Sequence, residues 1–350
     1  MWGSLRAALE AFAQSRWQQV GAAPPTLEQA LAIEQSGVLV GGYFKTGTTL
    51  LLALLDGHPE LVVVPGEVTL AQARATVAEL PSLERYHADA IHRLVNPSGT
   101  RPFWTLGRPA DAASDAYATF TFALRSAAVG DRGAIEASAI ALYAAQLAHG
   151  LLEPTARAWA AKRPNLECEL DGIRRLRPGV RFIHVVRNPA NTLASIIRLA
   201  RQGVMGYVDV VNASIGIARS LELAAERFAD ERYLVVRYED MVGDLERTLA
   251  KVSGFLEIEF RDLLLRPTVA GMPQLPNSAW AERRERGVVH SRSLKPAEDL
   301  EAGDLRTLRR HASRAAQALG YDLPALGAAT GLWTLAAQKA RSGSARLRHP

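Results

Sequence analysis

The stretch from 38 to 55 reads as a strand, a glycine-rich turn and a helix, in that order. Val38 to Val40 is a short apolar run of the kind that forms a buried strand, and an apolar helical pattern runs from Leu50 to Leu55. Between them lie three glycines: Gly41, Gly42 and Gly47. A strand that turns directly into a helix places free backbone N–H groups and the positive end of the helix dipole against an anion. The stretch therefore predicts a phosphate-binding loop.

The polar side chains of this loop narrow the kind of phosphate it can bind. Lys45 supplies a positive charge, and three threonines supply hydroxyl donors: Thr46, Thr48 and Thr49. In the loop of nucleoside triphosphatases a lysine directly follows the last glycine and reaches the β- and γ-phosphates. Here Thr48 occupies that position and Lys45 precedes Gly47. The loop departs from an ATP-binding loop, and a purely structural glycine turn in a Rossmann-like domain is also compatible with it.

Apolar runs elsewhere predict further strands of the same sheet: Leu61–Val64, Val180–Val186, Glu231–Arg237 and, more weakly, Gly133–Glu136. Helical patterns lie at Ala139–Ala161 with a break at Pro154, after Pro189, at Leu245–Leu256 and at Leu305–Leu319. Strands that alternate with helices form a mostly parallel sheet covered on both faces. We expect an α/β fold, a three-layer sandwich with a central sheet of about 4–5 strands. It is similar to the P-loop nucleoside-triphosphate hydrolases and carries a helical cap.

The same patterns divide the chain into three parts. Residues 1–36 are expected to form an N-terminal helical appendage. Residues 37–322 are expected to form the main domain, in which 71–160 are the helical cap. Residues 323–350 are expected to form a C-terminal helix and a basic tail, which allows weak contact with a membrane surface.

The composition excludes several classes of protein. The 350 residues contain one cysteine, Cys168, and no Cys/His spacing typical of a metal site, so no internal disulfide and no metal are expected. No apolar run reaches the roughly 18 residues of a membrane span, and no secretory signal is evident. The net charge of +5 suits an anionic ligand, but no nucleic-acid-binding motif is present. We expect a cytoplasmic protein, and its Ala/Arg-rich style is typical of bacteria; the oligomeric state is not predicted.

Polar clusters follow the apolar strands, and parallel strands deliver such clusters to one edge of a sheet. The first is the loop from Lys45 to Thr49, and Glu67 follows the second strand. Arg187 ends another strand, and Ser195 comes eight residues later, across the turn into a helix. A guanidinium and a hydroxyl in this arrangement can both reach a phosphate near the start of that helix. Two such anion sites would suit a ligand with two separated phosphate groups.

These residues resemble the sulfotransferases that use 3′-phosphoadenosine 5′-phosphosulfate. The first family signature corresponds to Phe44–Leu51, with Phe44 in place of the usual proline. The second corresponds to Arg187-Asn188-Pro189 through Ser195. Val235–Met241 with Phe255–Leu256 is similar to a further family stretch, and Asn277-Ser278 with Ser291–Lys295 to the C-terminal region that closes over the nucleotide. The resemblance covers roughly residues 37 to 322.

The resemblance implies roles for individual residues. The 5′-phosphosulfate would be held by the loop residues Lys45, Thr46, Gly47, Thr48 and Thr49, and the 3′-phosphate by Arg187 and Ser195. The remaining nucleotide contacts would come from Tyr238, Ser291, Arg292 and Lys295. The segment from His58 to Glu67 is similar to the heparan-sulfate and tyrosylprotein members, which implies that Glu67 is the catalytic base. Lys162 resembles a family lysine near the transferred group, although a solvated lysine at a helix end is an equal alternative.

The resemblance thus predicts an enzyme that transfers a sulfuryl group to an acceptor hydroxyl of a sugar, a tyrosine or a natural product. Adenosine 3′,5′-bisphosphate would be the product, and lysines with backbone N–H groups could stabilise the transferred group without a metal. Two alternatives remain open, a P-loop small-molecule kinase that uses ATP and Mg²⁺ and a nucleotide-binding protein without turnover. His184, inside an apolar strand, is interpreted as a hydrogen-bonded core histidine.

Overall fold

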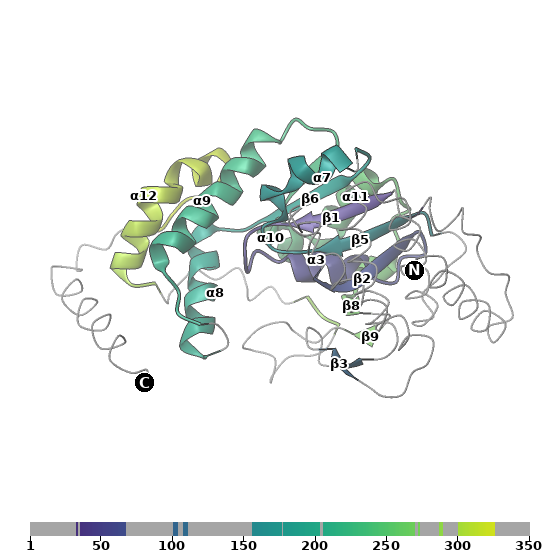
Figure 1. Ribbon diagram of the computed structural model, residues 1–350, viewed down its shortest axis with the longest axis horizontal. Helices are drawn as coiled ribbons and strands as arrows, with labels where there is room; N and C mark the ends of the chain where they lie inside the picture. Colours follow the sequence, from purple (N-terminus) through teal and green to yellow (C-terminus); the bar gives the residue numbers. More distant parts are fainter. Residues whose placement is uncertain are drawn as a thin grey trace, which may run out of the picture.

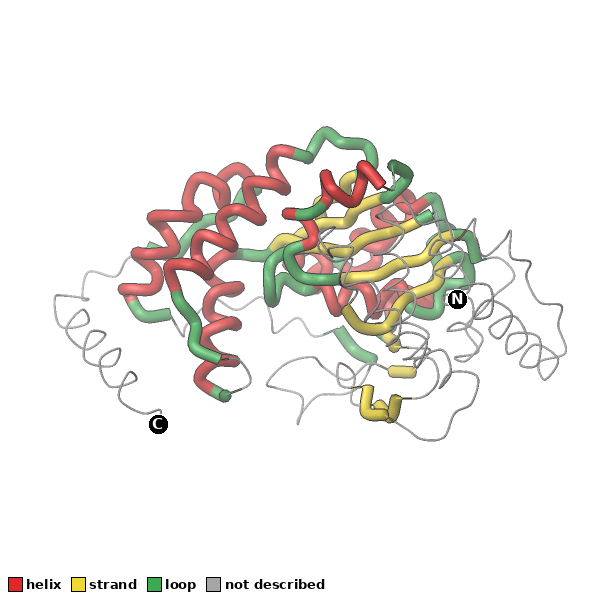
Figure 2. The backbone as a smooth tube through the Cα atoms, viewed as in Figure 1, coloured by secondary structure: helices red, strands yellow, loops and turns green. Residues whose placement is uncertain are grey.

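A five-stranded parallel β-sheet forms the centre of the computed structural model (Figures 1 and 2). The structure describes residues 33, 36–67, 101–103, 108–110, 156–176, 178–203, 206–269, 272–273, 287–289 and 300–325. In spatial order the sheet contains β2 (Leu61–Glu67), β5 (Ala158–Lys162), β1 (Gly37–Gly41), β6 (Arg181–Val186) and β7 (Tyr233–Arg237). Two short antiparallel pairs lie apart from it: β3 (Arg101–Phe103) with β4 (Arg108–Ala110), and β8 (Thr268–Val269) with β9 (Met272–Pro273).

The first strand occupies the middle of the sheet because it is apolar on both faces. All five residues of β1 are buried, and β1 pairs with β5 on one side and with β6 on the other. Parallel strands buried on both faces are near-continuous apolar runs, as β1, β5 and β6 are here. The chain moves from β1 to one edge of the sheet and later continues on the other side. Ligands of open α/β sheets bind at such a switch point, outside the carboxyl ends of the strands.

Helices cover both faces of the sheet. The described helices are α3 (Thr48–Leu55), η2 (Leu166–Cys168), α7 (Leu170–Leu176), α8 (Pro189–Arg201), α9 (Val210–Glu226), α10 (Tyr238–Gly243), α11 (Leu245–Leu256), η3 (Asp262–Leu265) and α12 (Ala302–Ala318). Alternate strand residues such as Val40 and Val185 pack against α3 and α11. The residues between them, such as Leu39 and Phe182, are fully buried on the opposite face, where η2 and α9 pack.

A second apolar core joins α8, α9 and α12, which lie together to the left of the sheet in Figure 1. Leu193 and Ile197 of α8, Ile217 and Leu221 of α9, and Leu308 of α12 are buried in it. Their helical spacing gives each helix one apolar face, and the three faces meet. This group continues directly from the carboxyl end of β6 through the turn at Arg187, so it fixes where that turn lies.

The structure confirms the α/β class with a parallel central sheet, and it corrects one element. Residues 158–160, assigned to a helix and to the cap, belong to strand β5. The Ala-rich stretch Ala158–Lys162 has the composition of a helix, but it lies between β1 and β2, where small and apolar side chains fit on both faces. Lys162 is therefore at the end of a strand and is buried, so the alternative of a solvated lysine at a helix end is wrong.

The other predicted strands and helices of the described residues are confirmed with small changes of boundary, and α11 has the predicted limits. The helix α9 had no counterpart among the expectations. The strand Gly133–Glu136 and most of the appendage 1–36, the cap and the tail lie outside the described residues. Within the described part of the chain, no helix has both the length and the apolar character needed to cross a membrane.

Candidate active site

The loop between β1 and α3 is shaped by two glycines that no other residue could replace. Gly42 has φ of 143°, and a Cβ there would lie 2.3 Å from the backbone oxygen of Val185. Gly47 has φ of 109°, and a Cβ there would lie 2.4 Å from Cδ2 of Tyr238. Lys45 between them is also left-handed, with φ of 68°. Such backbone conformations are uncommon outside glycine and concentrate at sites that bind ligands.

The threonines of the loop differ in their surroundings. The Thr46 hydroxyl donates to the backbone oxygen of Tyr43 over 2.8 Å, and this bond closes the turn from within. Thr48 is the first residue of α3 and is buried, whereas Thr49 beside it is half-buried. Since Gly47 makes no side-chain cap for α3, the first N–H groups of the helix are available to an anion.

The second turn follows β6, and Arg187 reaches from it to the first loop. Its Nη1 donates to the backbone oxygen of Lys45 over 2.9 Å and to the hydroxyl of Ser195 over 3.3 Å. The guanidinium carbon lies 4.5 Å from the centre of the Tyr238 ring, a cation–π distance. The predicted pair of anion-binding turns therefore lies side by side at the carboxyl edge of the sheet.

The turn at 187–189 is held in place from two sides. Asn188 caps α8 with its side-chain oxygen, which accepts from the N–H groups of Ala190 and Asn191. The backbone N–H of Asn188 donates to Glu239 over 2.9 Å, and the Tyr321 hydroxyl donates to the other oxygen of Glu239, also over 2.9 Å. Glu239 thus ties the turn before α8 to the chain that follows α12.

Three cations converge at this edge of the sheet. Burial lowers the pKa of Lys45, and the positive charges of Lys162 and Arg187 lower it further. Burial also lowers the pKa of Arg187. Lys162 is buried at the end of β5, where its backbone is in register with Val40 on one side and with Glu67 on the other. Positive charges that lower the pKa of Lys45 favour the binding of an anion among them.

Glu67 is described through its backbone, as the last residue of β2 and the partner of Lys162 in the sheet. The predicted base thus belongs to the same sheet edge as the loop. Ser291, Arg292 and Lys295 lie outside the described residues. Among the described residues, no group of three or more His, Cys, Asp or Glu side chains is arranged to hold a metal ion.

Comparison with known proteins identifies the chain. The sequence profile of the Sulfotransferase family matches residues 37–262, well over half of the 350 residues. The chain belongs to the Sulfotransferase family. It is an enzyme that transfers a sulfuryl group, as the two signatures and their spacing predicted.

Individual relatives of this sulfotransferase are distant in sequence. It is 24% identical over 293 residues to a Caenorhabditis briggsae protein described as a candidate protein-tyrosine sulfotransferase, covering 81% of this chain and 89% of the relative. The sulfotransferase domain of the Synechococcus PCC 7002 olefin synthase matches with a TM-score of 0.50 and 21% identity, over 82% of this chain and 95% of the domain. The sulfotransferase domain from the curacin biosynthetic pathway matches with a TM-score of 0.47 and 19% identity, over 82% and 98%. The olefin synthase domain supports the fold assignment.

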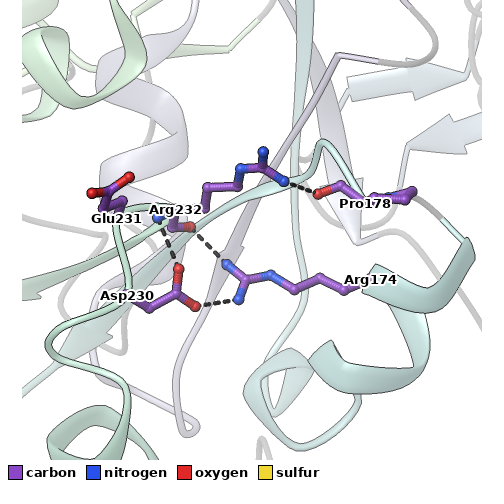
Figure 3. Close-up of a pocket in the computed structure, with 5 residues that line it drawn as sticks. All are labelled: Arg174, Pro178, Asp230, Glu231 and Arg232. Carbon is purple, nitrogen blue, oxygen red and sulfur yellow. Dashed lines mark hydrogen bonds and ion pairs between the residues drawn. The ribbon is translucent and has the colours of Figure 1, made fainter.

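A polar crevice of about 380 Å³ lies at the other end of the sulfotransferase sheet, where β6 and β7 begin (Figure 3). Its lining residues bond to one another: Arg174 contacts Asp230 and donates to the backbone oxygen of Arg232 over 3.0 Å, and Arg232 donates to the backbone oxygen of Pro178. These bonds join α7 to the chain before β6 and β7. The crevice is therefore a structural junction at the end of the sheet opposite the loop at 42–49 and the turn at 187–189.

The sequence did not reveal three residues that hold the two turns of the candidate site. Glu239 and Tyr321 support the second turn, and Glu167 accepts a hydrogen bond from the N–H of Gly42 over 2.9 Å. Glu239 lies in the stretch Val235–Met241 that carried the resemblance, so its position offered a signal. Glu167 and Tyr321 lie in segments without a recognisable motif.

Proposed function

We propose that the chain transfers the sulfuryl group of 3′-phosphoadenosine 5′-phosphosulfate to an acceptor hydroxyl. One observation carries the proposal: Arg187 of the second turn donates to the backbone oxygen of Lys45 in the first over 2.9 Å. A carrier with phosphate groups on both its 3′ and 5′ positions needs two anion sites that lie close together but separate. The left-handed glycine turn before α3 and the three converging cations support an anionic ligand of this kind.

The two turns would divide the donor between them. Lys45, Thr48, Thr49 and the N–H groups at the start of α3 would hold the 5′-phosphosulfate. Arg187 and Ser195 would hold the 3′-phosphate, and their mutual hydrogen bond of 3.3 Å supports a shared target. The ring of Tyr238, which lies against the Arg187 guanidinium, would hold that guanidinium in its orientation. Thr46, Ser291, Arg292 and Lys295 remain proposed nucleotide contacts.

The donor supplies an activated sulfuryl group whose bond to the 5′-phosphate oxygen breaks as the acceptor oxygen bonds to sulfur. Glu67 would take the proton of the acceptor hydroxyl, because a carboxylate within hydrogen-bond reach can act as a general base. Lys162, the sheet neighbour of Glu67, and Lys45 would stabilise negative charge that gathers on the leaving phosphate. Adenosine 3′,5′-bisphosphate leaves.

The acceptor belongs to the class of alcohols and phenols, and three kinds of hydroxyl should be tested: a sugar, a peptide tyrosine and a natural-product alcohol. The C. briggsae relative, described as a candidate protein-tyrosine sulfotransferase, supports including a tyrosine peptide.

We expect the reaction to take place in the cytoplasm. Residues 37–322 would form the catalytic domain, with the cap ending before β5, flanked by the appendage 1–36 and the tail 323–350.

Two experiments test the proposal. Calorimetry should detect binding of adenosine 3′,5′-bisphosphate, and ATP with Mg²⁺ should bind far more weakly; the reverse order would favour a kinase. Transfer of labelled sulfate from the donor to the acceptor panel should be lost in Glu67→Gln, while nucleotide binding is kept. Glu60→Gln, at the opposite end of β2, is the matched control and should retain turnover. Full activity of Glu67→Gln would exclude Glu67 as the base.

A further inference from the structure

A fully buried glutamate lies behind the donor loop, and nothing in the proposed reaction uses it. Glu167 belongs to η2, the short helical turn that follows β5 and Lys162. Its Oε2 accepts the backbone N–H of Gly42 over 2.9 Å, and its Oε1 accepts the hydroxyl of Ser220 over 2.6 Å. One carboxyl group thus joins the first residue of the loop to helix α9.

The hydrogen bonds beyond Ser220 run in one direction towards Glu167. Since the Ser220 hydrogen points to Glu167, its oxygen must accept from Nε2 of His184, which lies 2.9 Å away. The other ring nitrogen of His184 then accepts from the Tyr233 hydroxyl over 2.5 Å. Burial lowers the pKa of His184 to about 3, which keeps the imidazole neutral as this arrangement requires. The expectation of a hydrogen-bonded core histidine is confirmed.

The segment from Lys162 to Glu167 bonds to both backbone groups of Gly42, its N–H and its oxygen. Besides the bond from its N–H to Glu167, its backbone oxygen accepts the N–H of Asn165 over 3.0 Å. Gly42 has no room to shift, because even a Cβ would lie 2.3 Å from the oxygen of Val185. The segment from Lys162 to Glu167 therefore delivers a cation to the site and fixes the start of the loop at the same time.

Burying a carboxyl group this deeply lowers the stability of the fold. Glu167 has no exposed surface, and burial raises the pKa of its carboxyl group. Packed apolar residues often replace buried charged groups without loss of stability, so stability alone does not explain a glutamate here. A polar network whose members are all hydrogen-bonded does, however, fix one geometry of the backbone that it contacts.

We propose that Glu167 is a positioning residue for sulfuryl transfer: its carboxyl group, oriented by Ser220, His184 and Tyr233, holds the Gly42 peptide and so fixes the loop that binds the donor's 5′ group. The inference rests on the proposed function of that loop. It concerns the 5′ end of the donor, because Glu167 bonds to Gly42 of the first loop, whereas the groups assigned to the 3′-phosphate, Arg187 and Ser195, bond to each other. The two ends of the nucleotide can therefore be tested separately.

Two substitutions at Glu167 separate geometry from charge. Glu167→Leu removes both acceptors and leaves the N–H of Gly42 without its partner. Glu167→Gln keeps one acceptor for Gly42, and its amide can donate to Ser220, whose hydrogen then turns to Nε2 of His184. The conservative variant should therefore keep the loop in place, whereas the leucine variant should release it.

Calorimetry with the full-length chain measures the dissociation constants of two nucleotides. Adenosine 3′,5′-bisphosphate occupies both turns, whereas adenosine 3′-monophosphate lacks the group that the loop holds. Glu167→Leu should raise the dissociation constant of the bisphosphate roughly tenfold and leave that of the monophosphate within about twofold of wild type. Glu167→Gln should stay within about threefold for both. A folding defect would weaken the binding of both nucleotides to the same extent.

A pair of serine variants keeps the test valid if Glu167→Leu does not fold. Ser220→Ala removes the hydrogen bond to Oε1 of Glu167 and should raise the dissociation constant of the bisphosphate by about two- to fivefold. Ser214→Ala, on the same helix, is the control, because the buried Ser214 hydroxyl has no hydrogen-bond partner among the described residues. Equal weakening of the binding of both nucleotides in Ser220→Ala, or unchanged bisphosphate binding in Glu167→Leu or Ser220→Ala, would overturn the inference. A wild-type protein that binds neither nucleotide would overturn the proposed function itself.

Discussion

Arg187 and Lys45 lie 142 residues apart in the chain, and Nη1 of Arg187 donates to the backbone oxygen of Lys45 over 2.9 Å. The bond joins the turn after β6 to the loop after β1. It reaches the one loop residue, other than glycine, that has a left-handed backbone, with φ of 68°. The guanidinium therefore supports the conformation of the first anion site while it forms part of the second.

Arg187→Lys should weaken adenosine 3′,5′-bisphosphate binding by roughly tenfold or more, measured by calorimetry. A lysine keeps the charge, but its single ammonium group cannot bond to the Lys45 oxygen and the Ser195 hydroxyl in the same plane while it stacks on Tyr238. Arg201→Lys is the matched control, since Arg201 is the last residue of the helix that follows Arg187 and has about half of its side chain exposed. Equal affinities for the two variants would contradict this role of Arg187.

Binding of the bisphosphate should weaken as the pH rises into the alkaline range, because the pKa of Lys45 is lowered by burial and by Lys162 and Arg187. A bound anion favours the charged ammonium, so the pKa of Lys45 should rise when the nucleotide binds. Between the free and bound pKa values the complex holds a proton that the free protein lacks. Nucleotide binding is then coupled to proton uptake.

Calorimetry in buffers with different ionisation enthalpies measures this uptake directly. The part of the uptake that belongs to Lys45 should increase as the pH approaches the lowered pKa of Lys45. Lys45→Arg should abolish the uptake, because a guanidinium stays protonated throughout. An uptake that persists in Lys45→Arg would assign the proton to another group.

Gly47→Ala should destabilise the fold and abolish bisphosphate binding. A non-glycine residue at φ of 109° costs roughly 1–3 kcal/mol, and the new Cβ would also lie 2.4 Å from the Tyr238 ring that supports Arg187. Gly254→Ala is the contrasting control, because Gly254 is inside α11 with open space around it. That substitution should raise the free energy of unfolding by roughly 0.5–1 kcal/mol in urea titrations.

The two turns could be predicted from the sequence because each is continuous in the chain. A buried apolar strand, a glycine or proline turn and a polar start of a helix are local signals, and both the loop at 42–49 and the turn at 187–195 have them. Parallel strands then bring the two turns to one edge. The distance between Arg187 and Lys45 follows from the sheet order, in which β1 and β6 are neighbours.

The partners that hold these turns could not be predicted in the same way. Glu167, Glu239 and Tyr321 act through bonds that span 125, 51 and 82 residues of sequence. A single sequence gives no measure of which distant segments meet. Strand β5 was missed for a related reason, since its alanines favour a helix until neighbouring strands on both sides are considered. Packing between the neighbouring strands β1 and β2 makes this segment a strand.

The buried His184 makes the fold sensitive to acid. An unfolded chain protonates histidine near pH 6.5, whereas burial lowers the pKa of His184 in the folded protein to about 3. Between these values the unfolded chain binds the additional proton, so stability falls as the pH falls, by up to about 1.4 kcal/mol per pH unit. Urea titrations from about pH 7 to about pH 4.5 measure this slope.

His184→Gln should flatten that slope, because the amide does not titrate and can keep one hydrogen bond with Ser220. The variant should be less stable than wild type at neutral pH, where a bond to Tyr233 is lost, and the difference should shrink as the solution becomes more acidic. His311→Gln, a half-buried histidine of α12, is the control and should leave the slope of the wild type unchanged. Parallel pH profiles for wild type and His184→Gln would show that acid sensitivity arises elsewhere, in carboxylates such as Asp230 whose pKa is lowered by Arg174.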